Sequence, residues 1–278
     1  MGKPVMPEGL YISVSQLKCY LRCPRQYELK YVKGVPPAFL PVPFAFGSAF
    51  HETAAVMYSE LKNSGSLPAK TMLADTFRDS WARASSGSVP LQADEDDPVD
   101  LGAVTDKGVQ MVEVFHDHVM KTSSTMVVEA VEMPFAVSIH DPDTGEVMEE
   151  QLVGTMDLVV MDGGQRVVVE HKTGAKKWSE DQIRFDLQPT GYKLAARQAG
   201  MGDVGLRLQV VTKAKVPIVQ VADLDRGARD EDDFLRTAVG VLKAIDVGVS
   251  YPVRGWACRG CQFAHACKPK RPKLALVV

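Results

Sequence analysis

The sequence predicts an α/β fold. Apolar runs separated by turn residues fall within 126–172 and 204–221, which is the pattern of paired strands. Stretches with apolar residues at helical spacing come before, between and after these runs. The 278 residues are 45% hydrophobic and 24% charged, and this ordinary globular composition suits one large domain or two small ones.

The composition argues against a membrane protein. No apolar run approaches the roughly 20 residues that a membrane span needs. Residues 1–7 lack the apolar core of a signal peptide, so we expect a cytoplasmic protein with no membrane partner. The net charge of -3 does not favour a nucleic-acid partner, although clustering of Lys and Arg on one face matters more than their sum.

The first helical stretch spans residues 13–33. Ser13 or Ser15 can cap its start, and Pro24 ends or kinks the helix. Its basic residues indicate either a solvated helix face or a phosphate contact: Arg22, Arg25, Lys30 and Lys33.

Prolines in 36–43 predict a stiff connector, and a helix follows over 46–58. Gly47 and His51 lie four residues apart on one face of this helix. Glycine inside a helix costs up to ~1 kcal/mol against alanine, so we expect a close contact at Gly47. A lone helical histidine is usually structural.

Two amphipathic helices are expected within 62–122, around an acidic, solvated loop at 93–98. We interpret His116 and His118, in the second of these helices, as structural or exposed.

Strands are expected at 126–133 and 135–139. Glu129 or Glu132 could reach a metal if its strand ends at the site, but a solvated strand face is the favoured interpretation.

The most informative stretch is a predicted hairpin. Apolar runs at 158–161 and 167–169 flank an Asp-Gly-Gly-Gln turn, and three consecutive valines suit a strand buried on both faces. A buried strand has little reason to end in Glu170, His171 and Lys172 unless those groups are used. Side chains alternate along a strand, so Glu170 and Lys172 leave from one face.

Asp157, near the start of the neighbouring strand, can lie across from Glu170. Mg²⁺ or Mn²⁺ takes oxygen ligands, so both carboxylates and the backbone carbonyl of His171 could bind one cation. The metal would polarise a phosphoryl oxygen and lower the pKa of a bound water, and Lys172 would orient that water or offset negative charge. His51 would supply a further ligand.

The alternative interpretation of this hairpin is structural. An exposed Glu–Lys pair on a surface hairpin would contribute well under ~1 kcal/mol and bind nothing.

After the hairpin, residues 180–199 are helical in pattern. Pro189 implies either a kink or a helix that begins near Asp186 with Pro189 in its first turn. Three polar residues share one stripe that could bind a phosphate or orient Lys172, but a solvated face with the tyrosine half buried is the favoured interpretation: Arg184, Gln188 and Tyr192. A hairpin at 204–212 and 216–221 and a helix over 230–247 complete the pattern.

Three cysteines near the end have metal-ligand spacing: Cys258, Cys261 and Cys267. A structural zinc takes four ligands and an iron–sulfur cluster takes four thiolates, so one ligand is missing. His265, Cys19 and Cys23 are candidates, and we favour Cys23, which would tie the two ends of the chain together.

Six motifs, in this order along the chain, resemble the PD-(D/E)xK nuclease superfamily, in its branch of RecB-like, AddB-like and CRISPR-associated iron–sulfur exonucleases. They cover about residues 11 to 268: Cys23-Pro, Gly47-x-x-x-His51, Gly154-x-x-Asp157, Glu170-x-Lys172, Gln188-x-x-x-Tyr192 and Cys258-x-x-Cys261-x5-Cys267.

The resemblance implies a restriction-endonuclease-like core, a mixed central sheet flanked by helices, with an N-terminal helical region and a C-terminal Cys-rich segment. It implies that His51, Asp157 and Glu170 bind Mg²⁺ or Mn²⁺, that Lys172 is catalytic, and that Gln188 and Tyr192 lie beside the active site. It also implies a [4Fe–4S] cluster on four cysteines, with Zn²⁺ as the alternative: Cys23, Cys258, Cys261 and Cys267.

We therefore expect a metal-dependent DNA nuclease acting on single-stranded ends or branched DNA, in repair or recombination, with a helicase or recombination partner. Exonuclease action is favoured and endonuclease action stays open. The rival hypotheses are a non-catalytic DNA-binding or assembly subunit and a zinc-ribbon interaction protein. We expect an N-terminal helical region at 1–125, a nuclease core at 126–250 and a cluster segment at 251–278.

Overall fold

The computed structural model of the chain describes residues 9–92 and 100–267. The expected acidic loop at 93–98 and the first seven residues lie outside this part. The described chain holds a large sheet and a small two-stranded one. The strands are β1 Tyr11–Ser13, β2 Leu40–Pro41, β3 Leu91–Gln92, β4 Met126–His140, β5 Val147–Asp162, β6 Gln165–Gly174, β7 Gly205–Thr212 and β8 Val219–Leu224.

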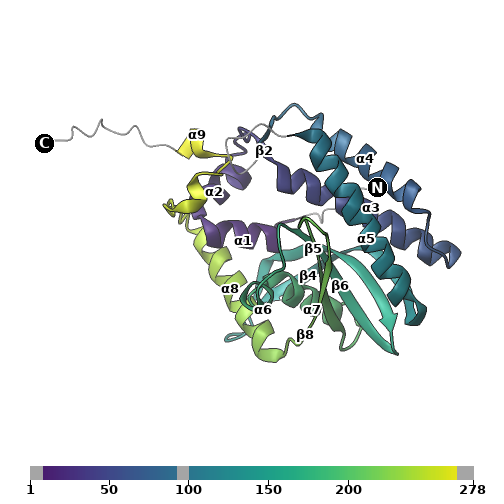
Figure 1. Ribbon diagram of the computed structural model, residues 1–278. Helices are drawn as coiled ribbons and strands as arrows, with labels where there is room; N and C mark the ends of the chain where they lie inside the picture. The colour runs from purple at the N-terminus through teal and green to yellow at the C-terminus, as the bar shows by residue number, and fades with distance from the viewer. Residues whose placement is uncertain (1–8, 93–99, 268–278) are drawn as a thin grey trace, which may run out of the picture.

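Helices surround the large sheet (Figure 1). They are α1 Val14–Arg22, α2 Pro24–Tyr27, α3 Val42–Ser64, α4 Lys70–Ser85, α5 Leu101–Thr122, α6 Glu180–Arg184, α7 Leu187–Gln198, α8 Ala228–Asp246 and α9 Ala264–Cys267, with short helical turns η1 Glu28–Val32, η2 Ser123–Thr125 and η3 Trp256–Cys258. None of the described helices is long and apolar enough to cross a membrane.

Strand β5 organises the large sheet. β4 pairs antiparallel with it along most of its length. Two strands pair with the other edge of β5, one after the other. β1 pairs parallel with residues 151–153, and β6 pairs antiparallel with residues 158–162. Beyond β6, β7 is parallel and β8 antiparallel. The mixed sheet flanked by helices is therefore confirmed, and residues 154–157 lie in the gap between the ends of β1 and β6.

The predicted hairpin is β5–β6. Gly163 and Gly164 form its two-residue turn with φ of 56° and 85°, the left-handed conformation that tight hairpin turns require. The predicted burial of β6 is also confirmed, since its three consecutive valines are at most 6% exposed. The buried central position of β6 leaves its C-terminal end as the place where polar side chains emerge.

Two apolar cores lie on the two sides of the sheet. Residues of α1, α7 and α8 form one core with β1 and β5, with Leu17 and Phe234 among its buried members. Residues of α3, α4 and α5 form the other, with Phe50, Phe77 and Phe115. The gap at residues 154–157 is thus bordered by helices from both layers.

Several boundaries differ from the sequence prediction. α3 begins at Val42, so Pro43 lies in the first turn of a helix, where its missing N–H is not needed, and not in a connector. β4 runs without a break through Pro134, which is tolerated because β4 is an edge strand. The expected close contact at Gly47 was wrong, because an added Cβ would meet only Thr173 Oγ1, at 3.9 Å.

The helical stretch after the hairpin divides at Asp186, which caps α7 through its side chain and places Pro189 in the first turn. This is the second of the two expected arrangements. Arg184 ends the separate helix α6, so the expected single stripe with Gln188 and Tyr192 does not exist. His116 is buried, with Nε2 3.1 Å from the carbonyl oxygen of Pro68, as expected of a structural residue.

Candidate active site

Three metal-ligating side chains converge beside the gap in the sheet. His51 of α3, Glu132 of β4 and Asp157 of β5 each offer one atom within 4.8 Å of the others. The Nδ1 atom of His51 lies 3.4 Å from Oδ1 of Asp157. The sequence predicted that His51 and Asp157 meet, and the structure brings them together.

Glu132 is the member of this group that the sequence offered as a possible metal ligand but for which a solvated strand face was favoured. It is the only non-glycine residue in the described chain with positive φ, at 49°, inside a strand that is otherwise extended. Burial and the nearby Asp157 carboxylate raise the pKa of Glu132. The interpretation of Glu132 as a solvated residue was therefore wrong, whereas Glu129 turns away to form an ion pair with Arg166.

Asp157 is held as a carboxylate. Burial alone would raise its pKa, but His51 and His171 outweigh burial and lower the pKa to about 2. The backbone N–H of His171 donates to Oδ2 of Asp157 at 2.8 Å. This bond links the two strands at the point where their polar side chains emerge.

The buried Glu170 forms an ion pair with the partly exposed Lys172 at the end of β6. Burial and the charge of Asp157 raise the pKa of Glu170 to about 7. Burial would lower the pKa of Lys172, but Glu170 outweighs it, so this pKa is raised and the side chain is an ammonium. The second carboxylate oxygen of Glu170, Oε2, is buried without a hydrogen-bond partner in the described chain.

Gln188 and Tyr192 of α7 lie beside this pair. The hydroxyl of Tyr192 donates to the carbonyl oxygen of Thr155 at 2.7 Å, within the gap between β1 and β6. Burial, followed by the charges of Glu170 and Asp157, raises the pKa of Tyr192, and Gln188 opposes this rise through a hydrogen bond. Tyr192 therefore closes the gap in the sheet and forms one wall of the site.

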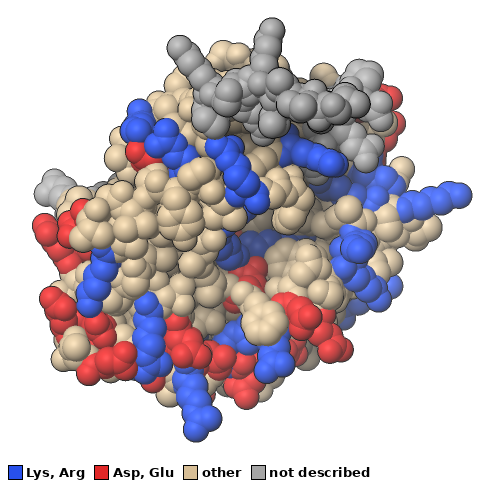
Figure 2. All heavy atoms as spheres, turned by 90° about the vertical axis from the view of Figure 1, so that its left-hand side faces the viewer, with Lys and Arg blue, Asp and Glu red and all other residues tan. Residues whose placement is uncertain are grey.

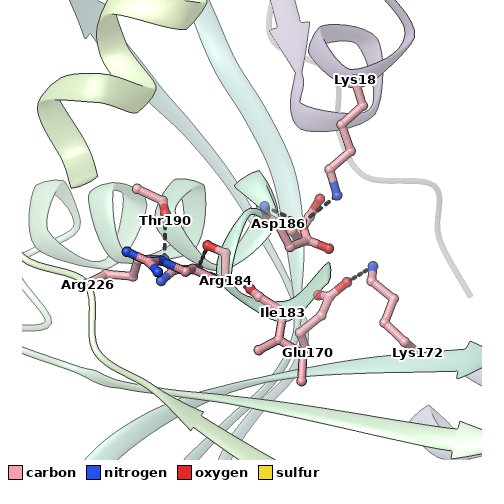
Figure 3. A network of polar contacts seen from close by, with 9 residues as sticks. Lys18, Glu170, Lys172, Ile183, Arg184, Asp186, Thr190 and Arg226 are labelled. Atoms are coloured by element: carbon pink, nitrogen blue, oxygen red, sulfur yellow. Dashed lines mark hydrogen bonds and ion pairs between the residues drawn. The ribbon is translucent and has the colours of Figure 1, made fainter. Parts of the chain in front are cut away.

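A second lysine reaches the same region (Figure 3). Lys18 of α1 pairs with Asp186 at 2.5 Å, and Asp186 also accepts from the backbone N–H of Gln188. Arg226, buried on the far side of α7, donates to Thr190 Oγ1 and to the carbonyl oxygens of Ile183 and Arg184, which fixes the α6–α7 turn. Lys18 was not predicted, because a single lysine in an amphipathic helix looks like any solvated residue.

The face of the molecule turned to the viewer in Figure 2 is hollowed near its centre, and acidic and basic side chains meet inside the hollow. Acidic and basic side chains alternate over the lower part of this face, and further lysines and arginines lie above and to the right of the hollow.

The four cysteines named in the sequence also come together. They line one small cavity, where α2 and α9 lie side by side in Figure 1: Cys23, Cys258, Cys261 and Cys267. Burial, followed by the three other cysteines, raises the pKa of Cys261. Cys19 is 5% exposed and packs in the core of α1, away from this cavity.

Comparisons with known proteins identify the family of this chain. The family model of the PD-(D/E)XK nuclease superfamily matches residues 11–268, nearly the whole chain. The chain belongs to that superfamily. No curated protein matches it significantly.

Solved structures align with this chain, and one with a TM-score above 0.5 shares its fold. A protein of Eubacterium rectale named as a "putative exonuclease" aligns with a TM-score of 0.53 at 15% identity, over 94% of this chain and 90% of that one. A protein named SSO0001 aligns with a TM-score of 0.46 at 15% identity, over 96% of this chain and 90% of that one.

Nucleases of this superfamily use divalent metals, and the residues present suit such an ion. Oxygen donors of Asp157 and Glu132 and a nitrogen of His51 already converge. The partnerless Oε2 of Glu170 is the kind of buried acceptor that a cation would satisfy. The donor set therefore fits a hard cation.

Proposed function

We propose that this nuclease hydrolyses phosphodiester bonds in DNA with Mg²⁺ or Mn²⁺, and that it acts on single-stranded ends or branched DNA. The observation that carries the proposal is the meeting of His51, Asp157 and Glu132 with the Glu170–Lys172 pair at the gap in the sheet. Three strands and a helix from distant parts of the chain converge on this point.

In this proposal His51, Glu132 and Asp157 hold the cation, and Glu170 adds its free oxygen. A bound cation would polarise the scissile phosphate and promote ionisation of a water molecule. The backbone N–H of His171 keeps the carboxylate of Asp157 in place. The low pKa of Asp157 keeps it charged at neutral pH.

Lys172 acts in this proposal as a cation and not as a base. Its raised pKa keeps the amine protonated, so it can only donate hydrogen bonds and offset charge. An ammonium fixed beside the scissile phosphate stabilises the negative charge that develops in the transition state. Glu170 holds Lys172 in position through the ion pair.

The four gathered cysteines support an iron–sulfur cluster. A [4Fe–4S] cluster takes four thiolates, and these four cysteines supply that number at one cavity. Such a cluster would join Cys23, which separates α1 from α2, to the C-terminal cysteines.

The experiment is digestion of end-labelled linear, circular and forked DNA with Mg²⁺ or Mn²⁺. We expect wild type to cleave, and we expect Asp157→Asn and Lys172→Ala to lose about 100-fold or more of the rate. Both variants should still bind DNA in EDTA. The matched controls are Asp141→Asn and Lys243→Ala, which break a remote surface ion pair, and these should cleave normally.

Metal-dependent cleavage by purified Asp157→Asn at the wild-type rate would contradict the proposal. Release of mononucleotides from linear DNA, with circular DNA left intact, would establish exonuclease action.

A further inference from the structure

A cavity of about 480 Å³ lies next to the candidate active site. Its walls come from β1, α1, η1, β4 and β5, and they are mostly apolar. Residues that define it are Tyr11, Gln16, Tyr31, Phe135, Ala136 and Thr155. Its volume falls within the range of small-molecule sites, and no residue of the metal-ligating group lines it.

Three aromatic rings face this cavity. Tyr11 is 37% exposed, and Tyr31 and Phe135 are partly buried. The ring of Tyr31 packs on Tyr27 with centroids 5.1 Å apart, so it is supported from behind. The ammonium of Lys30 lies 4.7 Å from the centroid of Tyr31, which places a positive charge beside this wall. Flat apolar rings next to a cation suit a ligand that is planar at one end and anionic at the other.

The cavity is continuous with the site along two strands. Thr155 precedes Asp157 by two residues on β5, and Pro134 follows Glu132 by two residues on β4. Two residues of extended strand span about 7 Å. Phe135 also packs edge-to-face on Tyr192, with centroids 6.0 Å apart, so one ring of the cavity touches the wall of the active site.

We propose that this cavity binds one unstacked nucleobase of a DNA strand whose neighbouring phosphate lies at His51, Glu132 and Asp157. This inference rests on the proposed nuclease function and deepens it. A base can enter only if it leaves the helical stack, so the site selects single-stranded or frayed DNA over an intact duplex. Stacking on aromatic rings does not depend on base identity, so the cavity accepts all four bases.

The first test is a scan with an abasic nucleotide placed in turn at each position of a short single strand. Binding is measured in EDTA, so that cleavage does not interfere. We expect affinity to fall roughly 5- to 150-fold when the abasic site occupies one position, the loss that removal of one stacked base causes. Other positions should change affinity far less.

The second test fills the cavity. Ala136 is exposed and lines it, so Ala136→Trp should occupy the space of the base without disturbing a core. The matched control is Ala103→Trp, at an exposed position of α5 that does not line the cavity. In Ala136→Trp we expect the abasic nucleotide to cause no further loss of DNA affinity, and we expect KM for single strands to rise. The control should behave as wild type. Thermal unfolding of both variants checks that they fold.

The outcomes separate this inference from the nuclease proposal. If a wild-type protein that cleaves DNA binds all the abasic strands with equal affinity, the base site is overturned and the nuclease function stands. The same holds if Ala136→Trp still loses affinity when the abasic nucleotide occupies that one position. A change in oligomeric state as the only effect of Ala136→Trp would identify the cavity as a contact between protein copies, which also overturns the base site. Absence of any cleavage by wild type would refute the nuclease proposal itself.

Discussion

The imidazole of His171 lies flat against the ring of Tyr58, with centroids 5.4 Å apart and planes 7° apart. Phe115 packs edge-on against the same imidazole, with centroids 5.3 Å apart. Burial lowers the pKa of His171 to about 4, so the imidazole is neutral at pH 7. The middle residue of Glu170-His171-Lys172 is thus anchored to α3 and α5, while its two neighbours form the ion pair at the candidate site. This packing fixes the backbone N–H that Asp157 accepts from.

Removal of this anchor should weaken both fold and site. Tyr58→Ala deletes a fully buried ring, and we expect the free energy of unfolding to fall by about 3–5 kcal/mol. Manganese affinity should fall as well, because the strand end that orients Asp157 loses its support. Tyr58→Phe keeps the stacked ring and is the control. Urea unfolding and manganese titration measure the two effects, and equal manganese affinity in all three proteins would exclude the anchoring role.

Glu132 should contribute to cation binding, although it precedes the hairpin. We expect Glu132→Gln to reduce manganese affinity roughly 10- to 100-fold. Glu129→Gln is the matched control on the same strand, since its carboxylate is paired with Arg166 and points away from the site. Isothermal titration with Mn²⁺ measures both variants. An affinity loss confined to Glu129→Gln would show that Glu129, and not Glu132, binds the cation.

The high pKa of Glu170 predicts a pH-dependent stability in the metal-free protein. A carboxyl whose pKa rises to about 7 on folding binds its proton more tightly in the folded state. Its contribution is fully present below the unfolded pKa of about 4.3 and is lost as the pH rises through about 7. We expect wild type to lose stability relative to Glu170→Gln over this interval. Urea unfolding in EDTA at several pH values measures the difference, and a constant difference would contradict the assignment.

The two motif glycines should respond in opposite ways to alanine. In Gly47→Ala the new methyl group meets ordinary contact distances, so we expect up to ~1 kcal/mol of added stability from helix propensity. In Gly154→Ala the Cβ would lie 2.5 Å from the ring of Phe135, and we expect a loss of about 1–3 kcal/mol. Thermal unfolding measures both. Equal destabilisation by both substitutions would mean that α3 approaches its neighbours more closely than the structure shows.

The cysteine assignment predicts a coloured protein. Wild type prepared without air should contain iron and absorb visible light, and Cys261→Ser should lose both and unfold at a lower temperature. Cys19→Ala is the control, because Cys19 packs in the core and does not line the cavity of the other cysteines. If elemental analysis finds zinc and no iron, the iron–sulfur assignment is wrong and the cysteines bind zinc.

Much of the fold could be predicted because its signals are local. The valine run, the Gly-Gly turn and the capping Asp186 each determine structure over a few residues. The meeting of His51 with Asp157 followed from the motif series, since neither residue alone is distinctive. The sequence marked Glu132 only as one of two possible ligands, because its place in the site depends on a positive φ that no sequence pattern marks. Lys18 was missed because its partner Asp186 is far away in the sequence.

The ring of Phe135 fills the volume into which any side chain at position 154 would project. Substitutions at these two positions on neighbouring strands therefore depend on one another. A lineage that acquired a larger residue at 154 would have to acquire a smaller one at 135, and the shape of the adjoining cavity would change with it. Covariation of this pair among relatives would consequently record changes in the shape of that cavity.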